Sequence, residues 1–201
     1  MITTYFGSPG SGKTTLACKL ALQDMRKKKN VFLNFKHKVN DAYICNLDKL
    51  GEWTFPQNST IIIDEAGIEY NNRSFKSFPK SAISWFKLHR HYSCDCVLLS
   101  QSWVDADVTL RRLSDVLWYV FKIGPFTICR RVYKRVTVDQ VSEQIIDGYK
   151  MANLAWLLLY PFQVNGWLCA ERFKVIFRPR YYRYFDTHER PDLPIKEFPK
   201  V

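Results

Sequence analysis

The amino-acid sequence predicts an α/β fold with a mainly parallel central sheet flanked by helices, followed by a C-terminal β-rich extension. Three observations support this prediction. Short β-prone runs recur through the N-terminal half of the chain, and helical patterns separate several of them. A glycine-rich loop joins the first β-prone run to the first helical pattern. In the C-terminal half the β-prone runs become longer and follow one another more closely.

The N-terminal half contains the strands expected to form the parallel sheet. They are short runs rich in β-branched and aromatic residues, at Ile2–Phe6, Val31–Phe35, Thr60–Asp64 and Asp95–Ser100. One helix is predicted from Lys13 to about Lys28 and another from about Lys80 to His91. Because parallel strands require crossover connections, this alternation predicts helices on both faces of the sheet.

The C-terminal half is expected to add further strands to this core. Val116–Ile123 and Thr127–Val136 are predicted strands, joined by a turn at Gly124 and Pro125. Val138–Tyr149 is predicted to be helical, and residues 166–186 return to strand-like alternation. The apolar run Ala152–Phe162 is about 11 residues long. It is therefore expected to be core, since a membrane-spanning helix needs about 20 residues.

Length and composition predict one packed domain. The chain has 201 residues, of which 47% are hydrophobic, enough for one full core and too few for two ordinary domains. We expect a domain over 1–189, with a core of about 1–123 and an extension of about 124–189. Residues 190–201 contain three prolines and are expected to form an extended tail.

Charge and cysteine usage restrict the classes of partner and compartment. The formal net charge of +11 favours encounter with polyanions, either nucleic acid or an anionic membrane surface. The six cysteines contain no CxxC pair and no histidine at zinc-ligand spacing, so buried reduced thiols are the favoured interpretation. No secretory signal precedes the first predicted strand. The sequence thus predicts a cytoplasmic protein.

The loop between the first strand and the first helix matches GxxxxGK[ST] in full. Its glycines allow several backbone N–H groups to point at one phosphate chain, beside a helix N-terminus. Lys13 is expected to meet the β- and γ-phosphates, and the Thr14 hydroxyl to bind Mg²⁺. The expected nucleotide-binding residues are Gly7, Ser8, Pro9, Gly10, Ser11, Gly12, Lys13, Thr14 and Thr15. The alternative is a glycine-rich turn that only connects strand to helix.

The strand at Thr60–Asp64 ends in an acidic residue and Glu65 follows directly, which supplies the second acidic element that a P-loop NTPase requires. Asp64 is expected to hold the Mg²⁺ shell, and Glu65 to orient or deprotonate the attacking water. The alternative is a strand that ends in two solvated acids. Together with the loop, this strand predicts an Mg-dependent P-loop ATPase with ATP and Mg²⁺ as cofactors.

Three further residues are candidates for catalysis. If an added strand separates the loop strand from the acidic strand, the pattern is that of NTPases with a catalytic glutamate, and Gln101 becomes a candidate γ-phosphate sensor. Arg111 and Arg112 could complete a neighbouring subunit's site as an arginine finger, which requires an oligomer. The alternative for these arginines is a solvated basic pair, or ion pairs with Asp107 and Asp115.

Several motifs together resemble the zonular occludens toxin (Zot) family, the filamentous phage assembly ATPases related to HerA/FtsK-type motors. These are the loop Gly7–Thr14, Ile61–Glu65, His89–His91 before Asp95–Gln101, Leu110–Arg112 with Asp115, and Tyr184–Thr187. The two nucleotide motifs are common to P-loop proteins in general. The stretch from His89 to Gln101 is the part that points to this family.

The resemblance implies a cytoplasmic motor, usually a ring, that couples ATP hydrolysis to extrusion or translocation of phage DNA. It also implies a membrane anchor after the motor domain, and the sequence up to Val201 predicts no spanning helix. We expect a homo-oligomer that handles DNA, preferably single-stranded, with membrane or phage assembly proteins as possible partners. The alternatives are a soluble genome-packaging ATPase that fills a preformed capsid, and a P-loop nucleotide switch or kinase.

Basic and aromatic residues alternate in Lys122–Arg135 and in Arg172–Arg183. In strands this alternation could place the charges on one face, which could track a nucleic-acid backbone. The alternative is that these residues form solvated outer faces of strands whose aromatic side chains are core. His89, Arg90 and His91 are expected to stabilise a helix end or to contact a neighbouring subunit.

Overall fold

The computed structural model describes residues 1–47, 50–52, 55–66, 80–103, 108–138, 145–155 and 172–185. The elements in the first two thirds of the chain are β1 Ile2–Phe6, α1 Lys13–Arg26, β2 Asn30–Leu33, β3 Tyr43–Ile44, β4 Ser59–Ile63, α3 Lys80–Leu88, β5 Cys94–Ser100, α4 Val108–Leu113 and β6 Val116–Ile123. They are followed by β7 Phe126–Val138, β8 Ile145–Met151, β9 Phe173–Phe177 and the 3₁₀ helix η3 Arg178–Tyr184.

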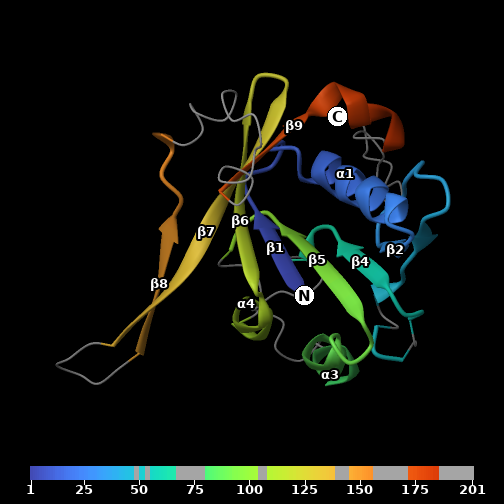
Figure 1. Cartoon of the computed structure of the whole chain (residues 1–201), viewed down its shortest axis with the longest axis horizontal. Coiled ribbons are helices and arrows are strands. Elements are labelled where there is room, and N and C mark those ends of the chain that lie inside the picture. Colours follow the sequence, from blue (N-terminus) through green and yellow to red (C-terminus); the bar gives the residue numbers. More distant parts are fainter. Residues whose placement is uncertain are drawn as a thin grey trace, which may run out of the picture.

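In the described part of the chain the strands form one nine-stranded sheet in the order β3-β2-β4-β5-β1-β6-β7-β8, with β9 paired to β7 (Figure 1). From β3 to β6 every neighbouring pair is parallel. The strand β7 pairs antiparallel with β6, β8 and β9. The predicted mainly parallel sheet with a C-terminal β-rich extension is therefore confirmed.

Helices cover both faces of the parallel half, as the sequence predicts. The strand β4 shows why both faces need cover, because all five of its residues are buried. Ile61 and Ile63 belong to a core cluster that includes Trp85 and Phe86 of α3. Ile62 belongs to the opposite cluster, with Leu16 and its neighbours on α1. A strand that alternates between two buried faces has no polar face, and it therefore reads as a continuous β-branched run.

The prediction of a helix over Val138–Tyr149 is wrong where the structure describes this segment. Residues 145–149 belong to the strand β8, which pairs antiparallel with β7 from Val138↔Ile145 to Val132↔Met151. Ile145 and Ile146 are β-branched and Gly148 disfavours a helix interior, so the local preference for helix is weak. Backbone pairing with the long neighbouring strand then decides the conformation.

The prediction of strand-like structure over residues 166–186 is correct only for β9. After Phe177 the chain turns into η3, which has a proline in its first turn. Proline has its φ angle preset for a helical turn and lacks the N–H group that a strand would donate. Residues 166–171 and 186, the tail at 190–201 and most of the apolar run at 152–162 lie outside the described residues. Within the described ranges, no helix is both long enough and apolar enough to cross a membrane.

Candidate functional site

The glycine-rich loop links the carboxyl end of β1 to the start of α1 and is held against the antiparallel strands. Gly10 and Gly12 have φ angles of 72° and 95°, which residues with a side chain rarely adopt. A Cβ atom on Gly12 would lie 2.0 Å from Thr127 Oγ1 of β7. The same hydroxyl donates a 3.0 Å hydrogen bond to the Ser11 carbonyl. The curled loop therefore requires glycine at position 12 for both backbone and packing reasons.

Lys13 lies within the curl of this loop. Its ammonium group donates hydrogen bonds to the carbonyls of Gly7, at 2.8 Å, and Ser8, at 3.1 Å. Burial lowers the pKa of Lys13, while the nearby carboxylates of Asp64 and Glu65 oppose this shift. A partly desolvated ammonium group in this position is suited to contact a phosphate that enters the loop.

Thr14 and Asp64 meet beside the loop, although 50 positions separate them in the sequence. The Thr14 hydroxyl donates a 2.8 Å hydrogen bond to Asp64 Oδ2. Burial raises the pKa of the Asp64 carboxyl, and the hydrogen bonds from Thr14 and from the Glu65 N–H oppose this shift. A hydroxyl and a carboxylate at this separation are hard oxygen donors that fit one Mg²⁺ ion, which retains several waters in such sites.

Asn34 positions the backbone of Asp64, a role that the sequence reasoning missed. Its side-chain amide accepts a hydrogen bond from the Asp64 N–H at 2.7 Å and donates one to the Asp64 carbonyl at 3.0 Å. Asn34 directly follows β2, which is the neighbour of β4 in the sheet. We call this pair of hydrogen bonds the Asn34 clamp. Its only signal in the sequence is an amide residue at the end of a neighbouring β-prone run.

Glu65 has a strained backbone and an exposed side chain. Its φ angle is 55°, in the left-handed region that non-glycine residues seldom occupy. Its N–H donates a 2.9 Å hydrogen bond to Asp64 Oδ1. Such strain is retained where the surroundings determine a side chain's direction, and it is common at functional sites.

A cavity of about 340 Å³ brings these residues together at the carboxyl edge of the sheet. The loop and the start of α1 contribute Pro9, Gly10, Gly12, Lys13, Thr14 and Thr15 to its lining. Asp64, Glu65 and the exposed Gln101, which follows β5, form a second side. Arg178, Tyr182 and Phe185 from η3 and the residue after it form a third side, which the sequence reasoning did not anticipate.

Among the other predicted loop residues, Gly7 and Ser8 contribute the carbonyls that hold Lys13, and the side chain of Ser11 is buried. The condition set for a catalytic glutamate is met, because β5 lies between β1 and β4 in the sheet. Gln101 follows Ser100, whose carbonyl accepts a 3.2 Å hydrogen bond from the Gly7 N–H, so Gln101 lines the cavity beside the start of the loop. The cavity is large enough to accept a phosphate chain between these groups.

Arg111 and Arg112 lie away from this cavity. They belong to α4, which immediately precedes β6. Since β6 runs parallel to β1, α4 lies at the amino edge of the sheet, opposite the loop (Figure 1). The suggested ion pair with Asp115 is not formed by these residues, because Asp115 binds Arg90 at 2.6 Å instead. Asp107 lies outside the described residues.

The basic residues of β7 do not all share one face of the sheet. Arg130 donates to the Ala152 carbonyl, whereas Arg131, the next residue, lies over the Trp118 ring at 5.4 Å. Neighbouring residues of a strand point to opposite faces, so the predicted single basic face of β7 is wrong. Arg131 and Lys174 instead line a separate hollow of about 420 Å³ with Trp118 and Tyr133.

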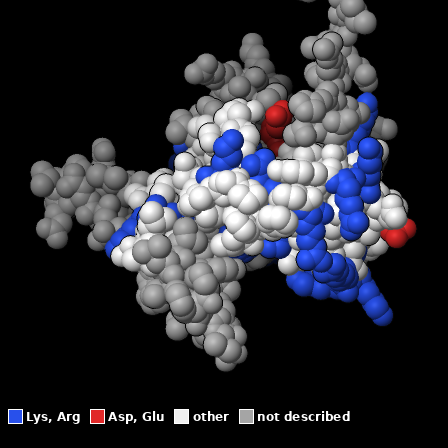
Figure 2. Space-filling view, turned by 90° about the horizontal axis from the view of Figure 1, so that it is seen from above, with Lys and Arg blue, Asp and Glu red and all other residues white. Residues whose placement is uncertain are grey.

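Lys174 is a partly buried cation of this hollow. It lies 4.4 Å from the centre of the Trp118 ring and donates to the Tyr5 hydroxyl at 2.8 Å. Burial lowers its pKa to about 8, and the positive charges of Lys19 and Arg131 act in the same direction. Further Lys and Arg side chains gather where α1 and η3 lie (Figure 2), among them Lys19, Arg26, Arg180 and Arg183.

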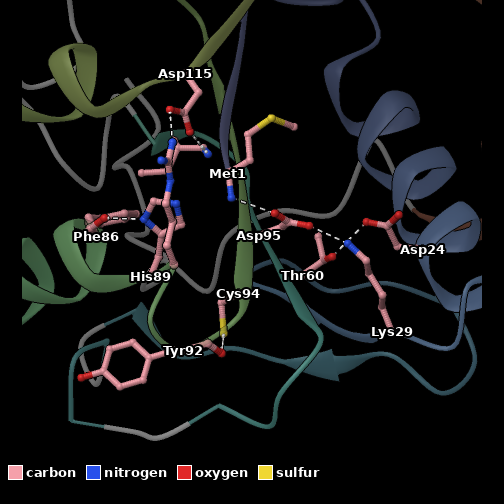
Figure 3. Close-up of polar contacts among 12 residues, drawn as sticks. Met1, Asp24, Lys29, Thr60, Phe86, His89, Tyr92, Cys94, Asp95 and Asp115 are labelled. Carbon is pink, nitrogen blue, oxygen red and sulfur yellow. Dashed lines mark hydrogen bonds and ion pairs between the residues drawn. The ribbon is translucent and has the colours of Figure 1, made fainter.

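The His-Arg-His segment stabilises the amino edge of the sheet (Figure 3). His89 is buried, and its Nδ1 pairs with the Phe86 carbonyl at 2.7 Å at the end of α3. Burial lowers the pKa of His89. Asp115 joins Arg90 to the backbone N–H of Ile2. The expected role at a helix end is therefore confirmed for His89.

The comparison with known proteins identifies the fold. The N-terminal domain of zonular occludens toxin from Neisseria meningitidis superposes with a TM-score of 0.54 at 22% identity, over 77% of this chain and 96% of that chain. The genome packaging NTPase B204 from Sulfolobus turreted icosahedral virus 2, in complex with sulfate, superposes with a TM-score of 0.52 at 12% identity, over 73% and 94%. A search of the curated proteins finds no match. These similarities confirm the predicted P-loop NTPase fold.

The sequence comparison decides the family. The profile described as Zonular occludens toxin (Zot) matches residues 1–154, which is more than half of the chain. The matched region contains the glycine-rich loop, Asp64 and Glu65, and the segment from His89 to Gln101. It ends before β9 and η3. The chain therefore belongs to the zonular occludens toxin family.

Proposed function

We propose that this chain is an ATP-hydrolysing motor of phage morphogenesis, which couples ATP hydrolysis to extrusion or translocation of viral DNA. The observation that carries the proposal is the meeting of Lys13, Thr14, Asp64 and Glu65 around one cavity. Lys13 and Thr14 begin the helix that follows the loop after β1, and Asp64 and Glu65 follow β4; β5 separates β1 from β4 in the sheet. Membership of the family of phage assembly ATPases supports the biological context.

Each side chain at the cavity has a task in this proposal. Lys13 and the loop N–H groups bind the β- and γ-phosphates. Thr14 and Asp64 hold Mg²⁺, which when bound neutralises charge that develops on the phosphates. Glu65 accepts a proton from the attacking water and Gln101 orients that water against the γ-phosphate. Hydrolysis requires an ionised Asp64, so its raised pKa predicts weaker metal binding in acid.

The proposed motor acts as a homo-oligomer in the host cytoplasm. Arg111 and Arg112 lie at the opposite edge from their own chain's cavity, so either would act only on a neighbouring subunit's nucleotide. The net charge of +11 and the hollow lined by Arg131 and Lys174 support DNA as the partner, with single strands favoured. Any membrane association would come through an assembly partner.

A genome-packaging ATPase is the second candidate function. It is favoured by the fold similarity to B204, which is named as a genome packaging NTPase. The two functions differ in the DNA that the motor handles. Stimulation by single-stranded DNA favours extrusion of a single-stranded genome, and stimulation by duplex DNA alone favours packaging.

The test is steady-state ATP hydrolysis by the purified chain with Mg²⁺ or with a chelator, and with single-stranded, double-stranded or no DNA. Lys13→Ala and Glu65→Gln are compared with matched changes at exposed positions, Lys27→Ala and Glu52→Gln. We expect DNA-stimulated, Mg-dependent hydrolysis that both cavity variants abolish and both control variants retain. Nucleotide binding without hydrolysis under every condition, including high protein concentration, would refute the motor and favour a nucleotide switch.

A further inference from the structure

The 3₁₀ helix η3 lies directly against the glycine-rich loop. Arg178 Nε is 3.5 Å from the position that a Cβ atom of Gly12 would occupy. The backbone of Arg178 is fixed, because its N–H donates a 2.9 Å hydrogen bond to the carbonyl of Pro125 in the β6–β7 turn. The base of the Arg178 side chain is therefore anchored while its guanidinium group faces the cavity.

The charge of Arg178 has no anionic partner in the described part of the chain. No salt bridge to it is found there, and its Nε is buried without a hydrogen-bond acceptor. It also adjoins the N-terminus of α1, which itself favours an anion. A buried guanidinium donor beside a helix N-terminus is costly unless a negatively charged group lies between them. A phosphate chain in the loop would supply that group.

Tyr182 lines the same cavity as Arg178. Tyr182 is 47% exposed, and its ring meets the Phe185 ring edge to face, at 6.4 Å and 82°. Phe185 is buried in a small cluster with Cys18 of α1, which anchors this aromatic pair to the helix. The Arg178 guanidinium lies 5.8 Å from the centre of the Tyr182 ring. One anchored segment thus presents a cation and a partly exposed aromatic ring to the cavity.

We propose that η3 completes the nucleotide site of its own chain, with Arg178 contacting the phosphates and Tyr182 stacking on the base. The inference rests on the proposed nucleotide-binding function and goes beyond it. Both residues lie after residue 154, where the family match ends. Because every base has a π-face, stacking on Tyr182 stabilises adenine and guanine nucleotides alike. A nucleotide bound in this way would also cover η3.

Calorimetric titration separates the two contacts by using two ligands, ATP and inorganic tripolyphosphate. Arg178→Gln lowers the affinity for both ligands by about tenfold or more, which is the loss typical of a hydrogen bond to a charged group. Tyr182→Ala lowers the affinity for ATP by roughly fivefold to a hundredfold and leaves the affinity for tripolyphosphate unchanged. Tyr182→Phe retains the ring and binds both as the wild type does. Arg180→Gln, an exposed change on the same segment, is the matched control.

Limited trypsin digestion gives a second readout that is independent of hydrolysis. Trypsin cuts after Arg180 and Arg183, whereas Pro179 protects the bond after Arg178. ATP is expected to slow these two cleavages in the wild type, and Tyr182→Ala to remove that protection. Suppose that the wild type binds ATP, that Lys13→Ala does not, and that Arg178→Gln and Tyr182→Ala bind ATP like the wild type. That result overturns the inference and leaves the proposed function standing. Absence of ATP binding by wild type overturns both.

Discussion

Replacing Asn34 by alanine tests whether the clamp on the Asp64 backbone matters for stability and chemistry. The substitution removes the 2.7 Å and 3.0 Å hydrogen bonds and leaves the N–H and C=O groups of Asp64 without these partners. Asp64 is 9% exposed, so water replaces the lost bonds poorly. The loss of two part-buried hydrogen bonds corresponds to about 2 kcal/mol of unfolding free energy. For a chain of this size, that lowers Tm by about 4–8 °C.

The same change is expected to slow hydrolysis more than it weakens nucleotide binding. Thr14 and the loop remain in place, whereas the carboxylate of Asp64 and the strained Glu65 lose their backbone support. A displacement of about 1 Å at reacting groups lowers the rate roughly a hundredfold. We expect kcat to fall by about tenfold to a hundredfold, with a much smaller change in ATP affinity.

Asn30→Ala is the matched control, because it lies at the other end of β2 and makes one exposed 3.4 Å hydrogen bond to the Gln57 carbonyl. Thermal unfolding by circular dichroism and steady-state hydrolysis are measured for both variants. Asn34→Ala should differ from the wild type in both assays, and Asn30→Ala in neither. Equal Tm and kcat values for the two variants would refute the clamp.

Three further outcomes are expected. Gly12→Ala should prevent nucleotide binding because its Cβ meets Thr127 at 2.0 Å, whereas Gly10→Ala, with open space around it, should bind measurably in the same titration; equal binding would contradict the packing argument. Burial alone would raise the pKa of Asp95, but hydrogen bonds from Lys29 and the amino terminus hold it below its usual value. Asp95→Asn should therefore lower Tm at neutral pH, and the difference should shrink as pH falls below about 4; a difference independent of pH would exclude this linkage. Ile62→Ala, in the buried core, should lower the unfolding free energy measured with denaturant by about 2–5 kcal/mol. The exposed control Ile44→Ala should leave it almost unchanged, and similar losses for the two variants would show that the core assignment is wrong.

Local sequence was sufficient to predict a feature wherever residues close together in the chain determine that feature. The loop at Gly7–Thr14 was identifiable because its glycines, Lys13 and Thr14 act within one turn between a strand and a helix. The strand ending at Asp64 was identifiable because a strand buried on both faces reads as an unbroken β-branched run. The position of β5 between β1 and β4 was set only as a condition, since sheet order depends on contacts between distant segments.

The sequence by itself determined the P-loop fold class, the two nucleotide motifs and the family, because each depends on local spacing. Only the tertiary structure decided the strand conformation of β8, which pairing with β7 imposes on a segment of weak local preference. Only the tertiary structure brought Asn34 to Asp64, Thr127 to the loop, and Arg178 to Gly12. These contacts join residues between about 30 and 170 positions apart in the chain, and sheet register and side-chain packing determine them.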